Sequence, residues 1–226
     1  MTIFLTSDTH FGHANIIKLS NRPFRDVQHM NEMLIKNWNS VVGPEDHVYH
    51  LGDVALGTFE ESIKCLGRLN GIKHLVTGNH DRMFIDPDVK NIERATKYKE
   101  RFLPQYAEYF KYIEEGTFDS EGFPAGAAEL LLIPEIKVNV STGENSYSSV
   151  LRMSHFPYTG DSHDKPRYDK IRPKDDGKVL LHGHTHQTNV VTRSAKGTLQ
   201  VHVGVDSWDY FPVSLECVLS LISENS

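Results

Sequence analysis

Five short apolar stretches of this chain each end in a cluster of Asp, Asn or His side chains. The clearest is residues 71–77, a stretch typical of a buried strand, which leads directly into Gly78-Asn79-His80-Asp81. Polar side chains just past the carboxyl ends of strands are typical of the ligand sites of α/β sheets. The other four stretches end at Asp8 and His10, at Asp53, at His155, and at His184 and His186. The sequence therefore predicts an α/β fold in which five strand ends share one site.

Helical patterns separate the first three of these strands. Apolar residues recur at steps of three and four through residues 27–41, with Asp26 as a candidate N-cap and a Gly-Pro pair at 43–44 ending the pattern. A second helix is expected to start at a capping box formed by Thr58 and Glu61. The order strand, helix, strand, helix, strand is that of a parallel or mixed sheet covered by helices.

The rest of the chain is expected to complete one domain, residues 1–226, because this length suits one large α/β domain. Residues 86–148 are less regular, and we interpret them as a small insertion or cap rather than a separate domain. A helix is expected in part of 91–116. Strands are predicted at four further places: 130–133, 136–140, 200–203 and 213–219.

Composition limits the classes of protein that remain. The chain has 24 Lys and Arg against 30 Asp and Glu, and a net charge of −6 argues against a basic nucleic-acid groove. Cys65 and Cys217 stand far apart, which predicts neither a disulfide framework nor a zinc knuckle and suits a reducing compartment. No signal peptide or apolar run of membrane-spanning length is visible, so we expect a soluble, cytoplasmic protein. The thirteen histidines, several of them clustered, favour a metal-binding function.

The spacing of the histidines favours metal binding at two of the strand ends. Asp8 and His10 are two residues apart, as are His184 and His186. In an extended segment such pairs point to the same side, which suits two ligands of one ion. The alternative interpretation for each pair is a polar loop after a strand.

The Gly78–Asp81 cluster contains three different functional groups. Asn79 offers a neutral oxygen ligand, and His80 is either a metal ligand or a proton donor. Asp81 could orient that imidazole. Asp53, directly after Gly52 at another strand end, is the candidate carboxylate for bridging two ions.

The motifs Asp-x-His, Gly-Asp, Gly-Asn-His-Asp, Ser-His and Gly-His-Thr-His occur in this order between Asp8 and His186. In this the chain resembles the calcineurin-like metallophosphoesterase superfamily, in particular its small single-domain bacterial or phage members. The resemblance implies a four-layer αββα sandwich of two mixed β-sheets flanked by helices, with a dinuclear metal site at the strand ends.

The resemblance also implies a role for each matching residue. His80 corresponds to the catalytic imidazole that binds no metal, with Asp81 as its partner. The implied ligands are Asp8, His10 and His186 for one ion, Asn79, His155 and His184 for the other, and Asp53 as the bridge.

These residue types suit the hydrolysis of phosphoric esters. Two cations roughly 3.5–4 Å apart can grip a phosphoryl group and turn a shared water into the attacking hydroxide. Mixed His, Asp and Asn ligands favour divalent transition metals, with Mn²⁺ first and Fe, Zn²⁺ or Ni²⁺ as alternatives. His80 would protonate the leaving oxygen or stabilise its charge.

The expected substrates are small phosphodiesters of nucleotide or 2′,3′-cyclic nucleotide type, because the short chain leaves little room for a large cap. Candidate substrate-binding residues are His13, Asn79, Arg82 and Arg167. The charged segment 158–178 either contacts the substrate or is a solvated loop. Alternatives are a phosphomonoesterase, a nuclease acting on nucleic-acid strands and, with less support, a non-catalytic binding scaffold. A membrane is not an expected partner, nucleic acid is not favoured, and the oligomeric state is not predicted.

Overall fold

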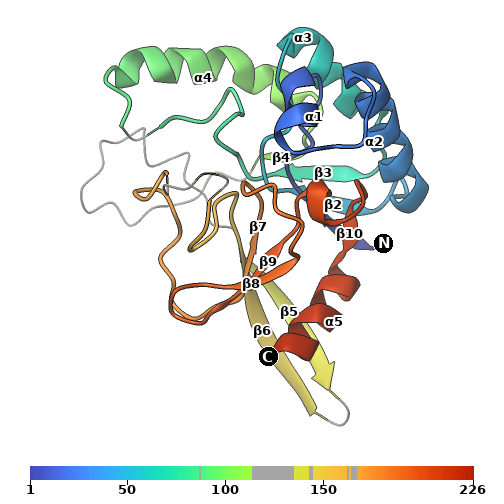
Figure 1. Ribbon diagram of the computed structural model, residues 1–226, viewed down its shortest axis with the longest axis vertical. Coiled ribbons are helices and arrows are strands. Elements are labelled where there is room, and N and C mark those ends of the chain that lie inside the picture. Colours follow the sequence, from blue (N-terminus) through green and yellow to red (C-terminus); the bar gives the residue numbers. More distant parts are fainter. Residues whose placement is uncertain (87, 114–134, 143–144, 162, 164–166) are drawn as a thin grey trace.

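The computed structural model describes residues 1–86, 88–113, 135–142, 145–161, 163 and 167–226, which form two mixed five-stranded sheets facing each other (Figure 1). The first sheet has the strand order β10-β1-β2-β3-β4. Strands β1 to β4 run parallel, and β10 is antiparallel to β1. The bounds are β1 Ile3–Thr6, β2 His47–His50, β3 Ile72–Leu75, β4 Tyr112–Ile113 and β10 Val213–Ser214.

The second sheet has the order β5-β6-β7-β9-β8, with β6, β7 and β9 parallel to one another. A parallel bridge between Ser7, just past β1, and Gly204, just past β9, joins the sheets at their carboxyl ends. The strand ends of both sheets therefore meet in one region. The bounds are β5 Glu135–Thr142, β6 Asn145–Met153, β7 Leu180–His182, β8 Val191–Arg193 and β9 Leu199–His202.

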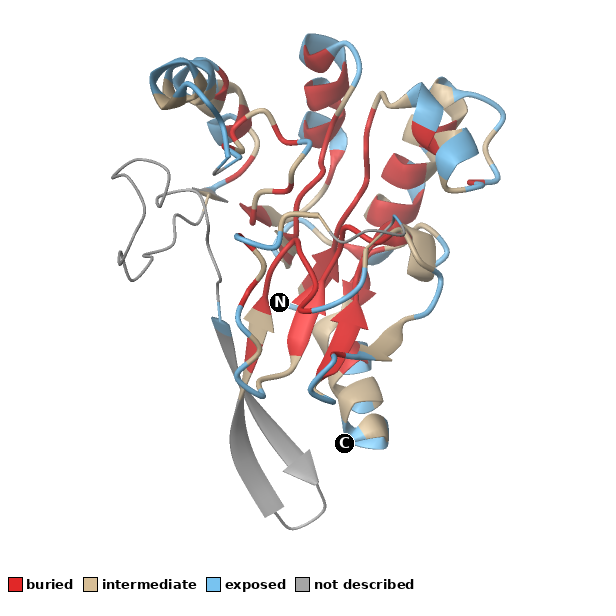
Figure 2. Ribbon diagram, turned by 60° about the vertical axis from the view of Figure 1, so that its left-hand side comes forward, coloured by how far each residue is buried: buried red, intermediate tan, exposed pale blue. Residues whose placement is uncertain are grey.

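Helices cover the outer face of the first sheet, and Figure 2 shows their buried sides turned toward it. Phe4, Val48 and Leu75 belong to the core on this helical side. Leu5 belongs instead to the core between the sheets, as expected for alternating strand residues. The helices are α1 Ala14–Leu19, α2 Val27–Val41, α3 Phe59–Ser62 with its 3₁₀ continuation Ile63–Arg68, and α4 Ile92–Ala107.

The predicted α/β class, two mixed sheets flanked by helices, is confirmed. The helix at 27–41 begins as expected, with Asp26 accepting a hydrogen bond from the His29 amide at 2.7 Å. The capping box at Thr58 is wrong in detail, because the Thr58 side chain makes no cap hydrogen bond and α3 is a single turn. The helix expected within 91–116 is α4.

The strand predicted at 213–219 is wrong beyond Ser214. That residue ends β10 and caps helix α5, Leu215–Asn225, by accepting a hydrogen bond from the Cys217 amide at 3.2 Å. Leu215, Val218 and Ile222 then pack on the core between the sheets at helical spacing.

Residues 86–148 supply elements to both sheets. Strand β4 extends the first sheet, and β5, which covers the strand predicted at 136–140, pairs with β6 in the second. The strand predicted at 130–133 lies outside the described residues. Within the described ranges, no helix is long and apolar enough to cross a membrane.

Candidate metal centre

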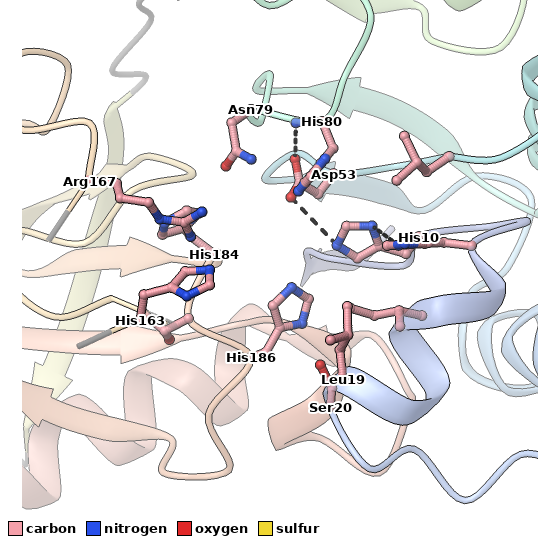
Figure 3. Close-up of a pocket in the computed structure, with 14 residues that line it drawn as sticks. His10, Leu19, Ser20, Asp53, Asn79, His80, His163, Arg167, His184 and His186 are labelled. Atoms are coloured by element: carbon pink, nitrogen blue, oxygen red, sulfur yellow. Dashed lines mark hydrogen bonds and ion pairs between the residues drawn. The ribbon is translucent and has the colours of Figure 1, made fainter. Parts of the chain in front are cut away.

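The predicted ligands converge from five turns, each following a different strand. Most of them border a cavity of about 570 Å³. Figure 3 shows His10, His184 and His186 directed into the same space, with Asp53 and Asn79 above them and Arg167 across the opening. The predicted ligands that line the cavity are His10, Asp53, Asn79, His184 and His186, while Asp8 and His155 are buried behind them.

Five of the seven predicted ligands have a left-handed rather than an extended backbone. The backbone φ angle is +58° at Asp8, +49° at His10 and +58° at Asp53, and it is +70° at His184 and +50° at His186. The expectation that each Asp-x-His or His-x-His pair lies on an extended segment is therefore wrong, although each pair does reach the same site. Such angles are uncommon in non-glycine residues and concentrate at functional sites, where the surrounding structure holds them.

Close backbone contacts hold the turns in place. The Asp8 amide donates to the Gly52 carbonyl at 3.0 Å, and the Gly183 amide donates to the His155 carbonyl at 3.1 Å. Gly52 has φ +89°, and a Cβ atom there would lie 2.3 Å from the Gly78 nitrogen. A side chain at this position would push the turns after β2 and β3 apart, so glycine is required.

Acceptor atoms converge at His155. Its Nδ1 lies 2.7 Å from the carbonyl oxygen of Leu51, which can only accept, so the ring proton is on Nδ1. In the neutral ring, Nε2 then presents a lone pair, and it lies 3.2 Å from Oδ1 of Asn79 and 3.5 Å from Oδ2 of Asp53. With the amide oxygen of Asn79 facing Nε2, these three atoms are all acceptors, and a cation between them would stabilise the arrangement, so these side chains fit a metal ion.

A second group lies around Asp8. Ligand atoms of Asp8, His10 and His186 all lie within 4.8 Å of one another, as do those of Asp8, Asp53 and His155. The Nε2 atoms of His10 and His184 are buried without a hydrogen-bond partner. Buried polar atoms are normally paired, so unpaired imidazole nitrogens beside carboxylates also fit cation binding.

The protonation of the groups follows from their burial. Burial, together with the neighbouring Asp8 and Asp81, raises the pKa of Asp53 to about 7 despite the opposing effect of His155. Burial and the nearby His186 lower the pKa of His10 well below its usual value. Removal from water disfavours the charged form of each group, and a bound cation would favour the ionised carboxylate and the neutral imidazole.

His80 lies at the cavity wall, with its ring centroid 5.5 Å from that of His10. Its backbone amide donates to Oδ1 of Asp53 at 2.8 Å. Burial and the neighbouring His155 lower the pKa of His80 to about 4. In the metal-free protein its ring is therefore neutral at pH 7 and can still donate one hydrogen bond.

Asp81 does not have the predicted geometry, because its carboxylate holds backbone rather than the His80 ring. It accepts hydrogen bonds from the amides of Asp53 at 2.9 Å, Val54 at 3.0 Å and Gly78 at 2.8 Å. The Tyr106 hydroxyl donates to it at 3.3 Å. Asp81 is buried and outside the cavity lining, so it fixes the turns after β2 and β3.

The predicted substrate-binding residues separate into two sets. His13, Asn79 and Arg167 line the cavity, and the Nδ1 atoms of His13 and His10 lie 3.4 Å apart. Arg82 does not line it, because its guanidinium stacks over the rings of Phe59 and Phe102 at 5.1 and 5.0 Å. The apolar environment of the helical layer holds this side chain away from the site.

Several residues at the site were not predicted. Asp161 lies 3.4 Å from Nε2 of His184 and also accepts from Arg172 at 2.7 Å. Asp206 accepts from Nδ1 of His186 at 2.8 Å. Asp161 follows no predicted strand end, so no signal in the sequence separates it from surface acids. Asp206 stands three residues after the strand predicted at 200–203, and this spacing was the signal that could have found it. Helix α1 was also missed, and with the loop after β2 it provides an apolar wall of the cavity made by Ile16, Leu19 and Leu56.

The fold and the convergent side chains describe an α/β protein of two mixed sheets with a candidate metal centre at the strand ends. The sequence model of the calcineurin-like phosphoesterases matches residues 1–188. The chain belongs to this family, so it is a metal-dependent hydrolase of phosphoric esters.

Similar proteins occur in two Mycobacterium phages and in Aquifex aeolicus. The gene 66 protein of Mycobacterium phage L5 is 32% identical over 208 residues, which cover 91% of this chain and 86% of that protein. The gene 66 protein of Mycobacterium phage D29 is 31% identical over 209 residues, covering 91% and 88%. A solved structure of a protein of unknown function from Aquifex aeolicus matches with a TM-score of 0.60 at 24% identity, covering 97% of this chain and 98% of that one. At this identity the structural match shows the fold alone.

Proposed function

We propose that the protein hydrolyses small phosphodiesters with an organic group of nucleotide size, 2′,3′-cyclic nucleotides among them. The observation that supports this proposal is that one wall of the cavity is apolar, while the rest of its described lining has a single side chain with a permanent positive charge. Ile16, Leu19 and Leu56 form an apolar wall, and Arg167 is the single Lys or Arg among the described residues that line the cavity.

The charge of the walls favours a diester over a monoester. A diester carries one negative charge, and a monoester dianion carries a second that needs a further cation. Arg172 is not placed to supply it, because its guanidinium donates to the carbonyls of Pro157 and Gly160 and to Asp161. An apolar wall, in turn, suits an uncharged organic substituent, since ligand sites combine apolar surface with a few polar groups.

Two divalent ions, with Mn²⁺ favoured, are proposed to occupy the centre. The proposed ligands are Asp8, His10 and His186 for one ion and Asn79, His155 and His184 for the other, with Asp53 touching both. When bound, such ions supply an activated water and neutralise charge on the phosphoryl oxygens.

His80 is proposed to act on the leaving oxygen. Its neutral ring can donate a hydrogen bond to that oxygen as the bond to phosphorus breaks, or deliver a proton acquired when the anionic substrate binds. His13 stands beside it on the α1 side and is proposed to contact the substrate, as are Asn79 and Arg167.

A substrate panel tests this proposal. The Mn²⁺-loaded protein should hydrolyse methyl p-nitrophenyl phosphate and 2′,3′-cyclic AMP with a higher kcat/KM than p-nitrophenyl phosphate. Chelator treatment should abolish all three activities, and Mn²⁺ should restore them. A clear preference for the monoester would identify a phosphomonoesterase, and preferential cleavage of single-stranded oligonucleotides would identify a nuclease. Absence of turnover in every case would favour a binding scaffold.

A further inference from the structure

Arg22 is a fully buried cation behind the metal centre. Its side chain is 0% exposed, and its Nε and Nη2 atoms donate to the two oxygens of Asp206 at 2.8 and 2.9 Å. The same guanidinium donates to the carbonyls of Asp8 at 2.7 Å and Thr9 at 3.2 Å. It therefore holds the left-handed Asp8 turn and Asp206 in one rigid fork, which a flexible ammonium could not reproduce.

Asp206 links this fork to His186. Its Oδ2 atom lies 2.8 Å from Nδ1 of His186, and its side chain is only 3% exposed. Arginine does not lose its proton in proteins, and its two donated bonds keep Asp206 ionised. An ionised carboxylate can only accept, so Nδ1 of His186 must carry the ring proton.

The tautomer decides what His186 presents to the centre. With the proton on Nδ1, Nε2 has a lone pair, and this atom lies 3.9 Å from Oδ1 of Asp8. The rings of His186 and His10 lie 5.1 Å apart. A proton on Nε2 would instead point a donor at this group and block ligation.

We propose that Arg22 and Asp206 are positioning residues of the metal centre, which fix the Nδ1–H tautomer of His186 and the Asp8 turn together. The link to an ion rests on the proposed function. The arrangement joins three segments that are far apart in the sequence: the turn after β1, the turn after β7 and the 3₁₀ turn Val205–Ser207. A salt bridge that served folding alone would have no need to reach a ligand imidazole.

Burial opposes a rise, but Asp8 and the hydrogen bond to Asp206 raise the pKa of His186. The tautomer is therefore measured in the metal-free protein at a pH where the ring is neutral, by long-range proton–nitrogen NMR correlations of the His186 ring. The wild-type ring should be protonated on Nδ1. Oδ2 of Asp206 contacts both Nη2 of Arg22 and Nδ1 of His186, and Asp206→Asn removes the charge on this acceptor, so the share of His186 rings protonated on Nε2 should rise. A wild-type ring protonated on Nε2 would overturn the inference without any variant.

Metal titration supplies the second measurement. Asp206→Asn should weaken Mn²⁺ binding at one of the two sites by about 10–100-fold, the usual effect of losing a residue that orients a ligand. Asp175→Asn is the matched control, because Asp175 accepts from Thr198 at 2.7 Å outside the cavity lining. It should change neither tautomer nor affinity.

Arg22→Lys separates the effect of Arg22 on the His186 tautomer from its effect on the Asp8 turn. It also provides a second test if Asp206→Asn fails to fold. It keeps the charge beside Asp206, so the tautomer should remain, whereas loss of the bonds to Asp8 and Thr9 should weaken Mn²⁺ binding. A folded Asp206→Asn protein with wild-type tautomer and affinity would refute the inference. Failure of the wild-type protein to bind Mn²⁺ would contradict the proposed function, while the tautomer result decides the positioning of His186 by itself.

Discussion

The Nε2 atom of His155 lies 3.5 Å from Oδ2 of Asp53, with the ring proton committed to the opposite nitrogen. Nε2 of His10 lies at the same distance from the same oxygen. One carboxylate oxygen therefore stands between two imidazole nitrogens that come from different sheets.

Asp53→Asn should remove the negative charge that lies between these two imidazoles and that is proposed to bridge the two ions. We expect turnover to fall by more than about 100-fold and the metal content to drop, since a bridging position serves both ions. Elemental analysis after dialysis and kcat/KM for methyl p-nitrophenyl phosphate measure the two effects. Asp88→Asn, a surface carboxylate paired with Lys170, is the control and should behave as wild type. Two retained ions and full turnover in Asp53→Asn would contradict the bridging assignment.

His80→Ala should separate chemistry from metal binding, because the ring points at the cavity and is not among the proposed ligands. Turnover of a diester with a poor leaving group should fall about 10²–10⁴-fold. A p-nitrophenyl diester should lose much less, since its leaving group departs without a proton. Loss of metal, or an equal loss on both substrates, would show that His80 is a ligand instead.

Arg167→Gln should lower kcat/KM for p-nitrophenyl phosphate more than for methyl p-nitrophenyl phosphate. Arg167 is the one guanidinium in the described cavity lining, so the second charge of a dianion depends on it. Arg68→Gln, which removes a surface guanidinium paired with Glu32, is the control. Equal effects on the two esters would argue that Arg167 stabilises its own loop and does not bind phosphate.

Asp81→Ala should act on folding more than on the chemistry of His80. It leaves three buried amides unpaired, and we expect the free energy of unfolding of the metal-free protein to fall by about 3 kcal/mol or more. Tyr106→Phe removes the hydroxyl bond to Asp81 and also the acceptor of the Arg82 amide at 3.0 Å, so it should cost about 1–3 kcal/mol. Urea denaturation measures both. Unchanged stability in Asp81→Ala, with the kinetic defect of His80→Ala, would restore the predicted Asp81–His80 partnership.

Buried neutral histidines should make the metal-free protein sensitive to acid. Burial lowers the pKa of His50 to about 3, against an unfolded value near 6.5. Below pH 6.5 the unfolded chain therefore binds a proton that the folded chain refuses. Stability should fall by up to about 1.4 kcal/mol per pH unit for this one residue down to pH about 3.

His50→Gln tests this effect, because it keeps a donor for the Thr9 hydroxyl, 2.9 Å from Nε2 of His50, and cannot titrate. Its free energy of unfolding should depend less steeply on pH between 6.5 and 4. His29→Gln is the control, since His29, in the first turn of α2, is only half-buried. Parallel pH curves for wild type and His50→Gln would contradict the assignment.

The sequence predicted the site well where a polar functional side chain comes directly after an apolar stretch. Asp8, Asp53 and His155 each stand one to three residues after a recognisable apolar strand, so these strands and the meeting point of their ends were predictable. The division into two sheets was implied by the family resemblance alone. Helix α5 was not predictable, because Val213, Leu215 and Cys217 alternate with polar residues as in a strand. Only the role of Ser214 as a helix cap distinguishes the two structures.

Partnerships across the fold were out of reach. Arg22 and Asp206 are 184 positions apart, and neither neighbours a motif. Asp81 was assigned to its sequence neighbour His80, whereas its bonds go mainly to the turn after β2. Adjacency in sequence predicts which groups arrive at a site, but packing decides which of them touch.

At the left-handed ligand positions, the side chains that the proposed catalysis needs lower the free energy of unfolding of the protein. Each non-glycine residue in that conformation costs of the order of 1 kcal/mol, which glycine would relieve. Selection for thermal stability alone would therefore replace Asp8, His184 and the other left-handed ligand residues before it changed the strands that precede them. A descendant that had abandoned hydrolysis would be recognisable by glycines at these positions in an otherwise intact, and more stable, sandwich.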